Sequence, residues 1–228
     1  MKRLDRVLLF FALSSSILII GCGHTNKLAN YNVRSQPFEI LSEATTAGAA
    51  SSSVASGTGN SLGDILAGIN SSTLSEETAA KLRRAANADA LAAQISKGFE
   101  NALVSYLAVA PTKGYNPSAT YRAETVLQNY SLSSDSTGTS AHISAISRII
   151  QRSSGALVWQ YSSSKDIALS TTSSSRTDGR AMLSAVNAAS LASMSESEIA
   201  DIFHNAARQI GSDIGETLRE DVAELAKH

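Results

Sequence analysis

Apolar residues recur at helical spacing over two long stretches of the chain. The first follows Ser75, where a hydroxyl and acidic residues suit a helix N-terminus, and it predicts a helix over 75–108 with a break near residues 87–89. Its apolar stripe comprises Leu91, Ile95, Phe99, Ala102 and Tyr106. The second begins at Ser195 with a Ser-Glu-Ser-Glu capping box, after an Ala-rich helix over 181–194. Its stripe comprises Ile199, Phe203, Ala206, Ile210, Ile214, Leu218 and Leu225.

A row of small residues runs beside this second stripe and consists of Ala207, Gly211 and Gly215. Glycine costs ~1 kcal/mol relative to alanine inside a helix, so two glycines one turn apart indicate the close approach of another backbone. That backbone belongs either to the domain's own sheet or first helix, or to a partner in self-association. The acidic end of the same helix, from Asp213 to Glu224, is most simply a solvated face.

Strands are predicted between these helices and before them. Residues 32–41 favour a first strand, with Pro37 marking its start or a sheet edge. Residues 121–132 and 142–151 favour two more, although a helix is not excluded for 142–151. A hairpin turn over 152–155 leads into 157–161, where Leu157, Trp159 and Tyr161 share one face. Trp159 is then either a core anchor or part of a partner-binding groove. Residues 111–117 read as a turn-rich connector.

This order of elements predicts an α/β (α+β) fold. We expect a two-layer sandwich in which a small, mainly antiparallel sheet of about four strands is packed by two long helices. One domain over 33–228 would follow a tether at 22–32, and an Ala/Ser/Gly-rich segment at 45–61 would be a flexible loop. The amphipathic stretch 62–69 could cap the core, lie on a lipid surface or bind a partner.

The N-terminus has the layout of a secretory signal peptide over residues 1–21. A positively charged head precedes an apolar run over 7–20, which is too short for a transmembrane helix. The run ends Ile19-Ile20-Gly21-Cys22, which resembles the lipobox of bacterial lipoproteins. The resemblance implies cleavage before Cys22 and acylation of Cys22, with palmitate as the expected acyl chain, so the membrane is a partner through this lipid anchor. The alternative is a buried or free cysteine behind an ordinary membrane anchor.

The residue after Cys22 is Gly23, whereas an aspartate at this position tends to retain lipoproteins of Gram-negative bacteria at the inner membrane. The resemblance therefore favours the outer membrane with the domain facing the periplasm; the inner membrane and the cell surface stay open. The charged residues indicate no further class of partner. The chain has 19 basic and 20 acidic residues, and the basic ones form no cluster that would indicate nucleic-acid binding. With Cys22 acylated, no disulfide can form within the chain.

The sequence contains no recognisable catalytic or metal-binding motif. Its histidines, at 24, 142, 204 and 228, lack metal-ligand spacing, and no Gly-x-Ser-x-Gly elbow occurs. His204 is most simply a solvated helix residue. We therefore expect no cofactor, no metal and no catalytic residue, and the residues we single out are Cys22 for lipidation and Ala207, Gly211, Gly215 and Trp159 for an interaction face.

The hairpin over 149–159 resembles a pattern in curli-secretion-type lipoproteins and in the lipoprotein activators of penicillin-binding proteins. There a strand ends in a Ser/Thr-Gly turn, and an aliphatic strand carrying tryptophan follows. The resemblance covers 121–225, but this chain has no pore-forming hairpin. Our first hypothesis is a non-enzymatic interaction or assembly module in the periplasm that contacts an envelope protein partner, and a homo-oligomer stays open. The alternative is an auxiliary lipoprotein of an envelope transport system that binds an apolar ligand. A hydrolase ranks last, because no site supports it.

Overall fold

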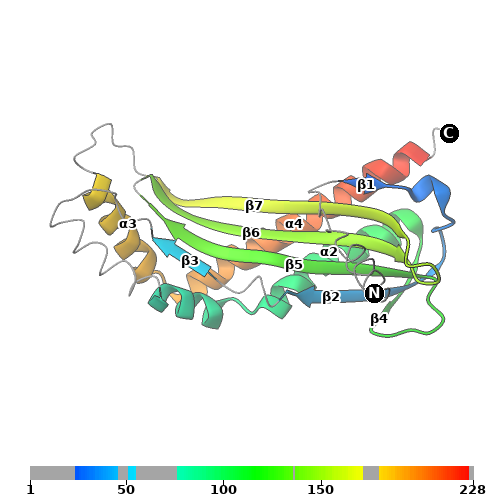
Figure 1. Ribbon diagram of the computed structural model, residues 1–228, viewed down its shortest axis with the longest axis horizontal. Helices are drawn as coiled ribbons and strands as arrows, with labels where there is room; N and C mark the ends of the chain where they lie inside the picture. The colour runs from blue at the N-terminus through cyan, green and yellow to red at the C-terminus, as the bar shows by residue number, and fades with distance from the viewer. Residues whose placement is uncertain (1–23, 46–50, 55–75, 136, 172–179, 226–228) are drawn as a thin grey trace, which may run out of the picture.

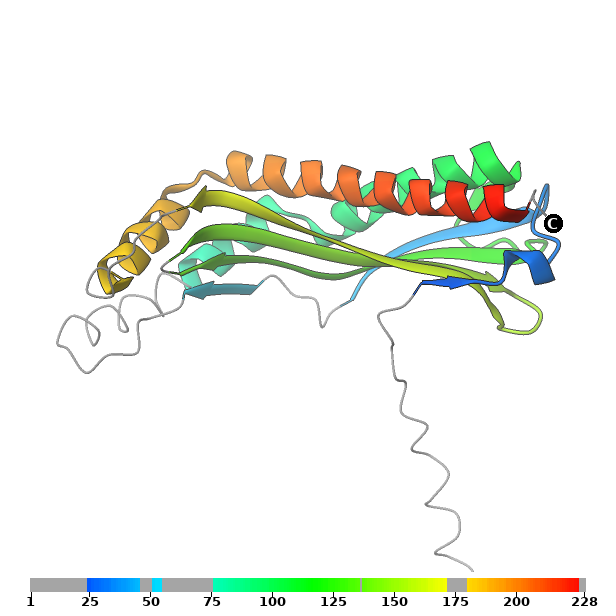
Figure 2. The same cartoon turned by 90° about the horizontal axis from the view of Figure 1, so that it is seen from above.

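The fold is a two-layer arrangement of one long, curved sheet and the helices that cover one of its faces (Figures 1 and 2). The structure, a computed structural model, describes residues 24–45, 51–54, 76–135, 137–171 and 180–225. The signal peptide, Cys22 and the stretch 62–69 lie outside these residues, so their predictions stay predictions.

The sheet has seven strands in the order β1-β7-β6-β5-β2-β4, with β3 also paired to β5. The middle is antiparallel, from β5 to β6 to β7, whereas β2 and β3 run parallel to β5 and β4 runs parallel to β2. The α+β class is therefore confirmed, but the sheet differs in detail from the expected one: it has seven strands rather than about four, and three of its six strand pairs are parallel. The strands are β1 Thr25–Asn26, β2 Pro37–Ala44, β3 Ser51–Val54, β4 Ala110–Lys113, β5 Tyr121–Ser134, β6 Gly138–Gln151 and β7 Leu157–Thr171.

Two long helices, α2 (Ala88–Leu107) and α4 (Glu196–Leu225), lie side by side on one face of the sheet (Figure 2). A helix over 76–85 and α3 (Arg180–Ser193) lie toward the end where β3 pairs with β5. The break predicted near 87–89 is present, because α2 begins at Ala88 after the separate helix over 76–85. The Asn87 side chain caps α2 by accepting a hydrogen bond from Ala90 N at 3.1 Å.

The core lies between the sheet and α2 and α4. In β5, residues 121, 123, 125 and 127 are buried and alternate with half-buried residues that face away from the helices. The stripe predicted for α2 is buried except Tyr106, which is 37% exposed. In β7, the neighbouring residues Val158 and Trp159 are both buried. The reason is a β-bulge: Ile149 pairs with Trp159 and Ile150 pairs with Leu157, so Val158 is an extra residue in β7.

Three segments predicted to lack regular structure form parts of the sheet. Residues 24–31, expected in the tether, contain β1 and a 3-10 turn, η1 (Leu28–Asn30), whose Leu28 is buried. Residues 51–54, expected in the flexible loop, form β3, and residues 110–113 at the start of the connector form β4. Each is short and polar or proline-containing, and it is placed by backbone pairing to a longer strand rather than by an apolar pattern of its own.

The capping box at the start of α4 is confirmed. Ser195 N donates to Glu198 Oε2 at 2.7 Å, and Glu198 N donates to Ser195 Oγ at 3.2 Å. The Ser195 hydroxyl and backbone N–H also lower the pKa of the Glu198 carboxyl. The carboxylate thus stays ionised at the positive end of the helix, where the helix dipole favours it.

The contact between α2 and α4 leads to a prediction about Gly98. A Cβ added at Gly98 would lie 2.6 Å from the carbonyl carbon and oxygen of Gly211, so the helices would have to separate. We expect Gly98→Ala to lower the free energy of unfolding by about 1–3 kcal/mol, the usual cost of overpacking, despite the better helix propensity of alanine. Urea unfolding followed by circular dichroism measures the change.

Gly215→Ala is the matched control, because its Cβ would meet only Ala102 Cβ at 3.3 Å and Gly98 O at 3.5 Å. A small neighbouring shift accommodates this contact, and the helix propensity of alanine offsets up to ~1 kcal/mol. Equal effects of the two substitutions would contradict the close backbone contact at Gly98.

Candidate functional site: the N-terminal attachment site

The described fold begins at His24, two residues after the lipobox cysteine. Its backbone leads into β1, whose Thr25 and Asn26 pair with Gln160 and Trp159 of β7. Lys27 N then donates to Val158 O at 2.9 Å. The chain is therefore fixed to the sheet from its first described residues onward.

The His24 side chain is held by a buried carboxylate. His24 Nε2 donates to Asp221 Oδ2 at 2.6 Å, and the same oxygen accepts a hydrogen bond from Trp159 Nε1 at 2.6 Å. Asp221 lies near the end of α4 and is only 5% exposed. One carboxylate oxygen thus joins the N-terminus, β7 and α4, and charge-assisted bonds of this length are the stronger kind.

Aromatic rings surround this contact. Trp159 stacks on Phe99 of α2 with ring centroids 5.3 Å apart, and the His24 ring meets Trp159 and Tyr161 edge-on at 6.3 and 5.8 Å. Trp159 is fully buried, and this position favours its interpretation as a core anchor. Its indole N–H also fixes the carboxylate that receives the N-terminus.

The structure brings Trp159 close to the segment that follows Cys22, but it places the small residues elsewhere. Ala207, Gly211 and Gly215 are buried, and a Cβ on Gly211 would lie 2.9 Å from Ile95 O of α2. The close approach predicted for the glycines is thus made within the chain by α2. Gly211 and Gly215 thus face α2, and the role of this row in meeting a partner stays a prediction.

Asp221 was missed because it belongs to the acidic end that the sequence analysis interpreted as a solvated face. A signal was available: position 221 continues the apolar stripe of Ile214 and Leu218 at helical spacing. A single carboxylate on a buried stripe needs a partner, since an unpaired buried charge is costly. Trp159 and His24 are those partners.

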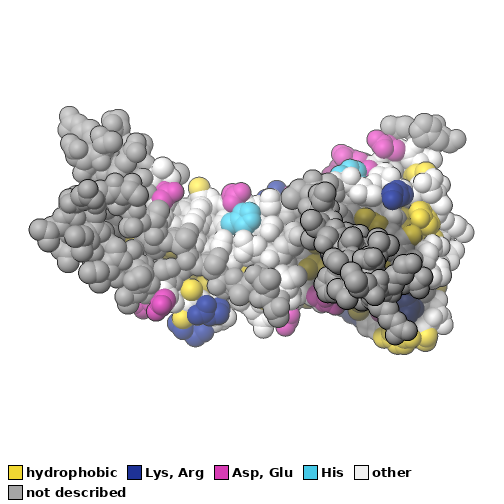
Figure 3. Space-filling model, in the orientation of Figure 1, with side chains coloured by type: hydrophobic (Ala, Val, Ile, Leu, Met, Phe, Trp, Pro, Cys, Tyr) yellow, Lys and Arg dark blue, Asp and Glu magenta, His cyan; other side chains and the backbone are white. Residues whose placement is uncertain are grey.

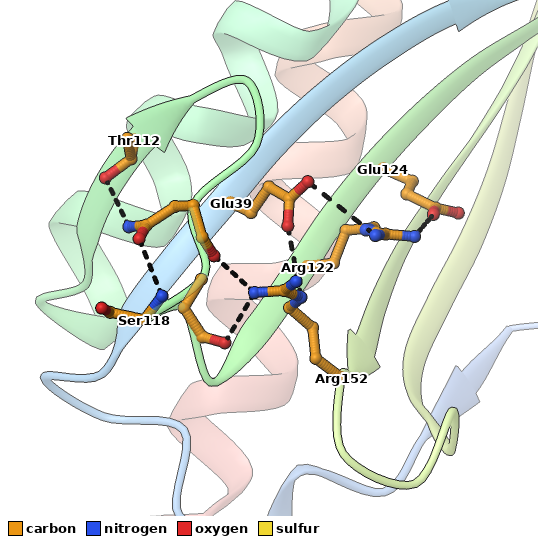
Figure 4. A network of polar contacts seen from close by, with 8 residues as sticks. Glu39, Thr112, Ser118, Arg122, Glu124 and Arg152 are labelled. Atoms are coloured by element: carbon orange, nitrogen blue, oxygen red, sulfur yellow. Dashed lines mark hydrogen bonds and ion pairs between the residues drawn. The ribbon is translucent and has the colours of Figure 1, made fainter.

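A second polar cluster lies on the opposite face of the sheet, where Glu39 of β2 is 2% exposed (Figure 4). Arg152 Nε lies 3.3 Å from its Oε2, and Arg122 Nη2 lies 3.8 Å from its Oε1. Arg152 also donates to the carbonyl oxygens of Asn116 and Ala119, the latter at 3.2 Å. This cluster ties the hairpin turn after β6 to the loop before β5, which is a structural role.

The remaining histidines in the described residues have ordinary polar partners. His142 Nδ1 lies 2.7 Å from Asp166 Oδ1 across β6 and β7, and His204 Nδ1 lies 2.8 Å from Gln94 Oε1. Within the described part of the chain, no group of three or more His, Cys, Asp or Glu side chains is placed to hold a metal ion. None of the described helices is long and apolar enough to cross a membrane.

Comparison with known proteins gives only loose structural likenesses. No protein-family model matches the chain, and no curated protein matches its sequence. A DUF330-family protein from Xanthomonas campestris is 10% identical with a TM-score of 0.40, covering 86% of this chain and 90% of that one. The PelC dodecamer from Paraburkholderia phytofirmans is 10% identical with a TM-score of 0.31, covering 83% and 95%. A candidate lipoprotein from Caulobacter crescentus is 12% identical with a TM-score of 0.26, covering 56% and 83%. Because these scores are low, function is inferred from the chain's own residues.

Proposed function

We propose that the chain is a bacterial envelope lipoprotein, acylated at Cys22, that acts as a non-enzymatic interaction or assembly module on the periplasmic side of the outer membrane. The observation that carries this proposal is the docking of His24 onto Asp221, beside Trp159. Cleavage before Cys22 would leave every described residue in the mature protein. The contact between His24 and Asp221 would therefore be kept after cleavage.

The position of His24 also limits how far the domain can move from its anchor. Two extended residues reach about 7 Å, whereas the tether expected over 22–32 would have reached about 36 Å. In the proposed lipoprotein, the anchored segment would therefore join the fold at β1, which pairs with β7. Each buried methylene contributes ~0.8 kcal/mol, so two or three acyl chains on one residue hold a protein essentially irreversibly.

Cell fractionation tests the proposal through two substitutions. We expect Cys22→Ser to abolish acylation and to move the protein out of the outer-membrane fraction. Gly23→Asp keeps the cysteine, and we expect it to keep the protein in the membrane but move most of it to the inner-membrane fraction. Density-gradient separation of the two membranes with immunoblotting gives the distribution. Outer-membrane location of the Cys22→Ser form would overturn the lipoprotein proposal, and finding the unaltered protein in the inner-membrane fraction would overturn its assignment to the outer membrane.

A further inference from the structure

One edge of the sheet has backbone groups that no described residue pairs. On the β4 side of β2, Ile40 O accepts a hydrogen bond from Gly114 N at 3.4 Å, and the pairing of β2 with β4 ends at Ile40 and Lys113. On the β5 side, Thr45 N donates to Leu127 O at 3.1 Å. Backbone groups of successive strand residues point to opposite sides, so those of Ser42 and Ala44 point to the β4 side, beyond the end of β4.

A cavity of about 730 Å³ lies against this open edge. Its floor comes from Ile40, Leu41 and Ser42 of β2, and its far wall comes from the turns of α2 that carry Ala93 and Lys97. A strand added to the edge would place alternate side chains into this cavity, between β2 and α2. This is the arrangement of sheet-edge addition, in which main-chain bonds give affinity and side-chain pockets give specificity.

The charges at the cavity favour a carboxylate on the incoming strand. Lys113 stands at the end of β4 and is exposed, and no described residue forms an ion pair with it. Lys97 is the second cation, and it lies 3.3 Å from Glu100, the acidic residue of the lining. The lining therefore carries one cation in excess, next to the point where β4 ends.

We propose that the open edge of β2 and the adjoining cavity bind an extended peptide segment of a partner protein, with a carboxylate of that segment facing Lys113. The segment adds as a strand beside β2, and its backbone bonds to Ser42 and Ala44. This proposal rests on the interaction-module function and names the chemistry of the partner. It does not depend on the lipid anchor, so it can be tested on the chain from residue 22 onward carrying Cys22→Ser.

The probe is a display library of random heptapeptides with free C-termini, selected on this soluble protein. We expect enriched peptides to combine alternating apolar residues with a carboxylate and to slow hydrogen exchange at the amides of Ser42 and Ala44. We expect Ser42→Pro to weaken the measured Kd at least tenfold, because it removes an N–H that points out of the sheet. Proline is tolerated at such edge positions, and thermal unfolding checks that the fold is kept.

Charge reversal gives a second test that does not alter the backbone. We expect Lys113→Glu to weaken binding of the selected peptides at least tenfold, while Lys27→Glu, the same change at an exposed residue beside β1, leaves it unchanged. Three results would overturn the proposal: peptides that bind all variants equally, slow exchange at Ser42 and Ala44 without peptide, or a co-purifying lipid that protects this region instead. None of these three results bears on the cell-fractionation test of Cys22, so a failure of this proposal can be told apart from a failure of the lipoprotein proposal.

Discussion

Replacing Glu39 with alanine is expected to lower the free energy of unfolding by about 3 kcal/mol, the lower end of the cost of breaking a buried ion pair. Glu39 is 2% exposed and is the carboxylate between Arg122 and Arg152. Its removal leaves two guanidinium groups facing each other, and only Arg122 keeps a carboxylate partner, Glu124. The lower end of the range applies because the Arg122 and Arg152 side chains are themselves 35% and 20% exposed, so water screens part of the repulsion.

The effect of Glu39→Ala should extend beyond β2, because Arg152 holds the loop before β5. With its carboxylate partner gone, Arg152 is less restrained and its bonds to Asn116 and Ala119 weaken. We therefore expect faster hydrogen exchange in residues 114–120 as well as a lower urea midpoint. This residue range contains Tyr115, whose ring lies under Arg152 at 5.4 Å.

Glu124→Ala is the control for Glu39→Ala. Glu124 pairs with the same Arg122 at 3.4 Å but is more exposed. An exposed ion pair contributes about 0–1 kcal/mol, so this change should be small. If the two alanine substitutions cost the same in urea unfolding, the buried position of Glu39 would not be the source of the stability.

The second large effect is expected at the attachment site. Asp221→Ala should lower the free energy of unfolding by about 2–3 kcal/mol, because it leaves the buried Trp159 Nε1 without its acceptor and removes a charge-assisted bond. The same variant releases His24, so residues 24–27 should exchange hydrogen faster than in the parent protein. Urea unfolding of the soluble Cys22→Ser form gives the first quantity, and exchange mass spectrometry gives the second.

His24→Ala separates the two contributions, because it removes only the partly exposed partner of Asp221. We expect it to cost at most about 1 kcal/mol while still freeing residues 24–27, since the bond between Trp159 and Asp221 remains. A large loss of stability in His24→Ala, or no change in exchange at 24–27, would contradict the shared-carboxylate arrangement.

The helices and the central hairpin could be predicted because their apolar residues repeat at 3.6 or 2 positions. The capping box at Ser195, the break at Asn87 and the turn ending in Gly155, whose φ is 70°, depend on local chemistry that the sequence displays directly. The short strands β1, β3 and β4 could not be predicted in this way. Their polar residues form strands only because a longer strand offers a backbone partner.

The polar clusters were missed for a related reason. Glu39 lies between Phe38 and Ile40, and its alternate position suggests the solvated face of the sheet. Figure 3 shows charged side chains and histidine scattered over the described part of that face. Its burial depends on arginines from β5 and from the turn after β6, which only the sheet register brings near. The role of Asp221 likewise depends on its hydrogen bonds with Trp159 and His24, which are far away in the sequence.

The most direct test is tandem mass spectrometry of the N-terminus of the protein purified from membranes. Trypsin should release the peptide from Cys22 to Lys27, and we expect it to carry a diacylglyceryl group on the thiol and usually an acyl chain on the amine. Absence of this modified peptide from the Cys22→Ser form would confirm Cys22 as the acylation site. An unmodified peptide beginning at Cys22, or a chain that still begins at Met1, would contradict lipid anchoring through Cys22.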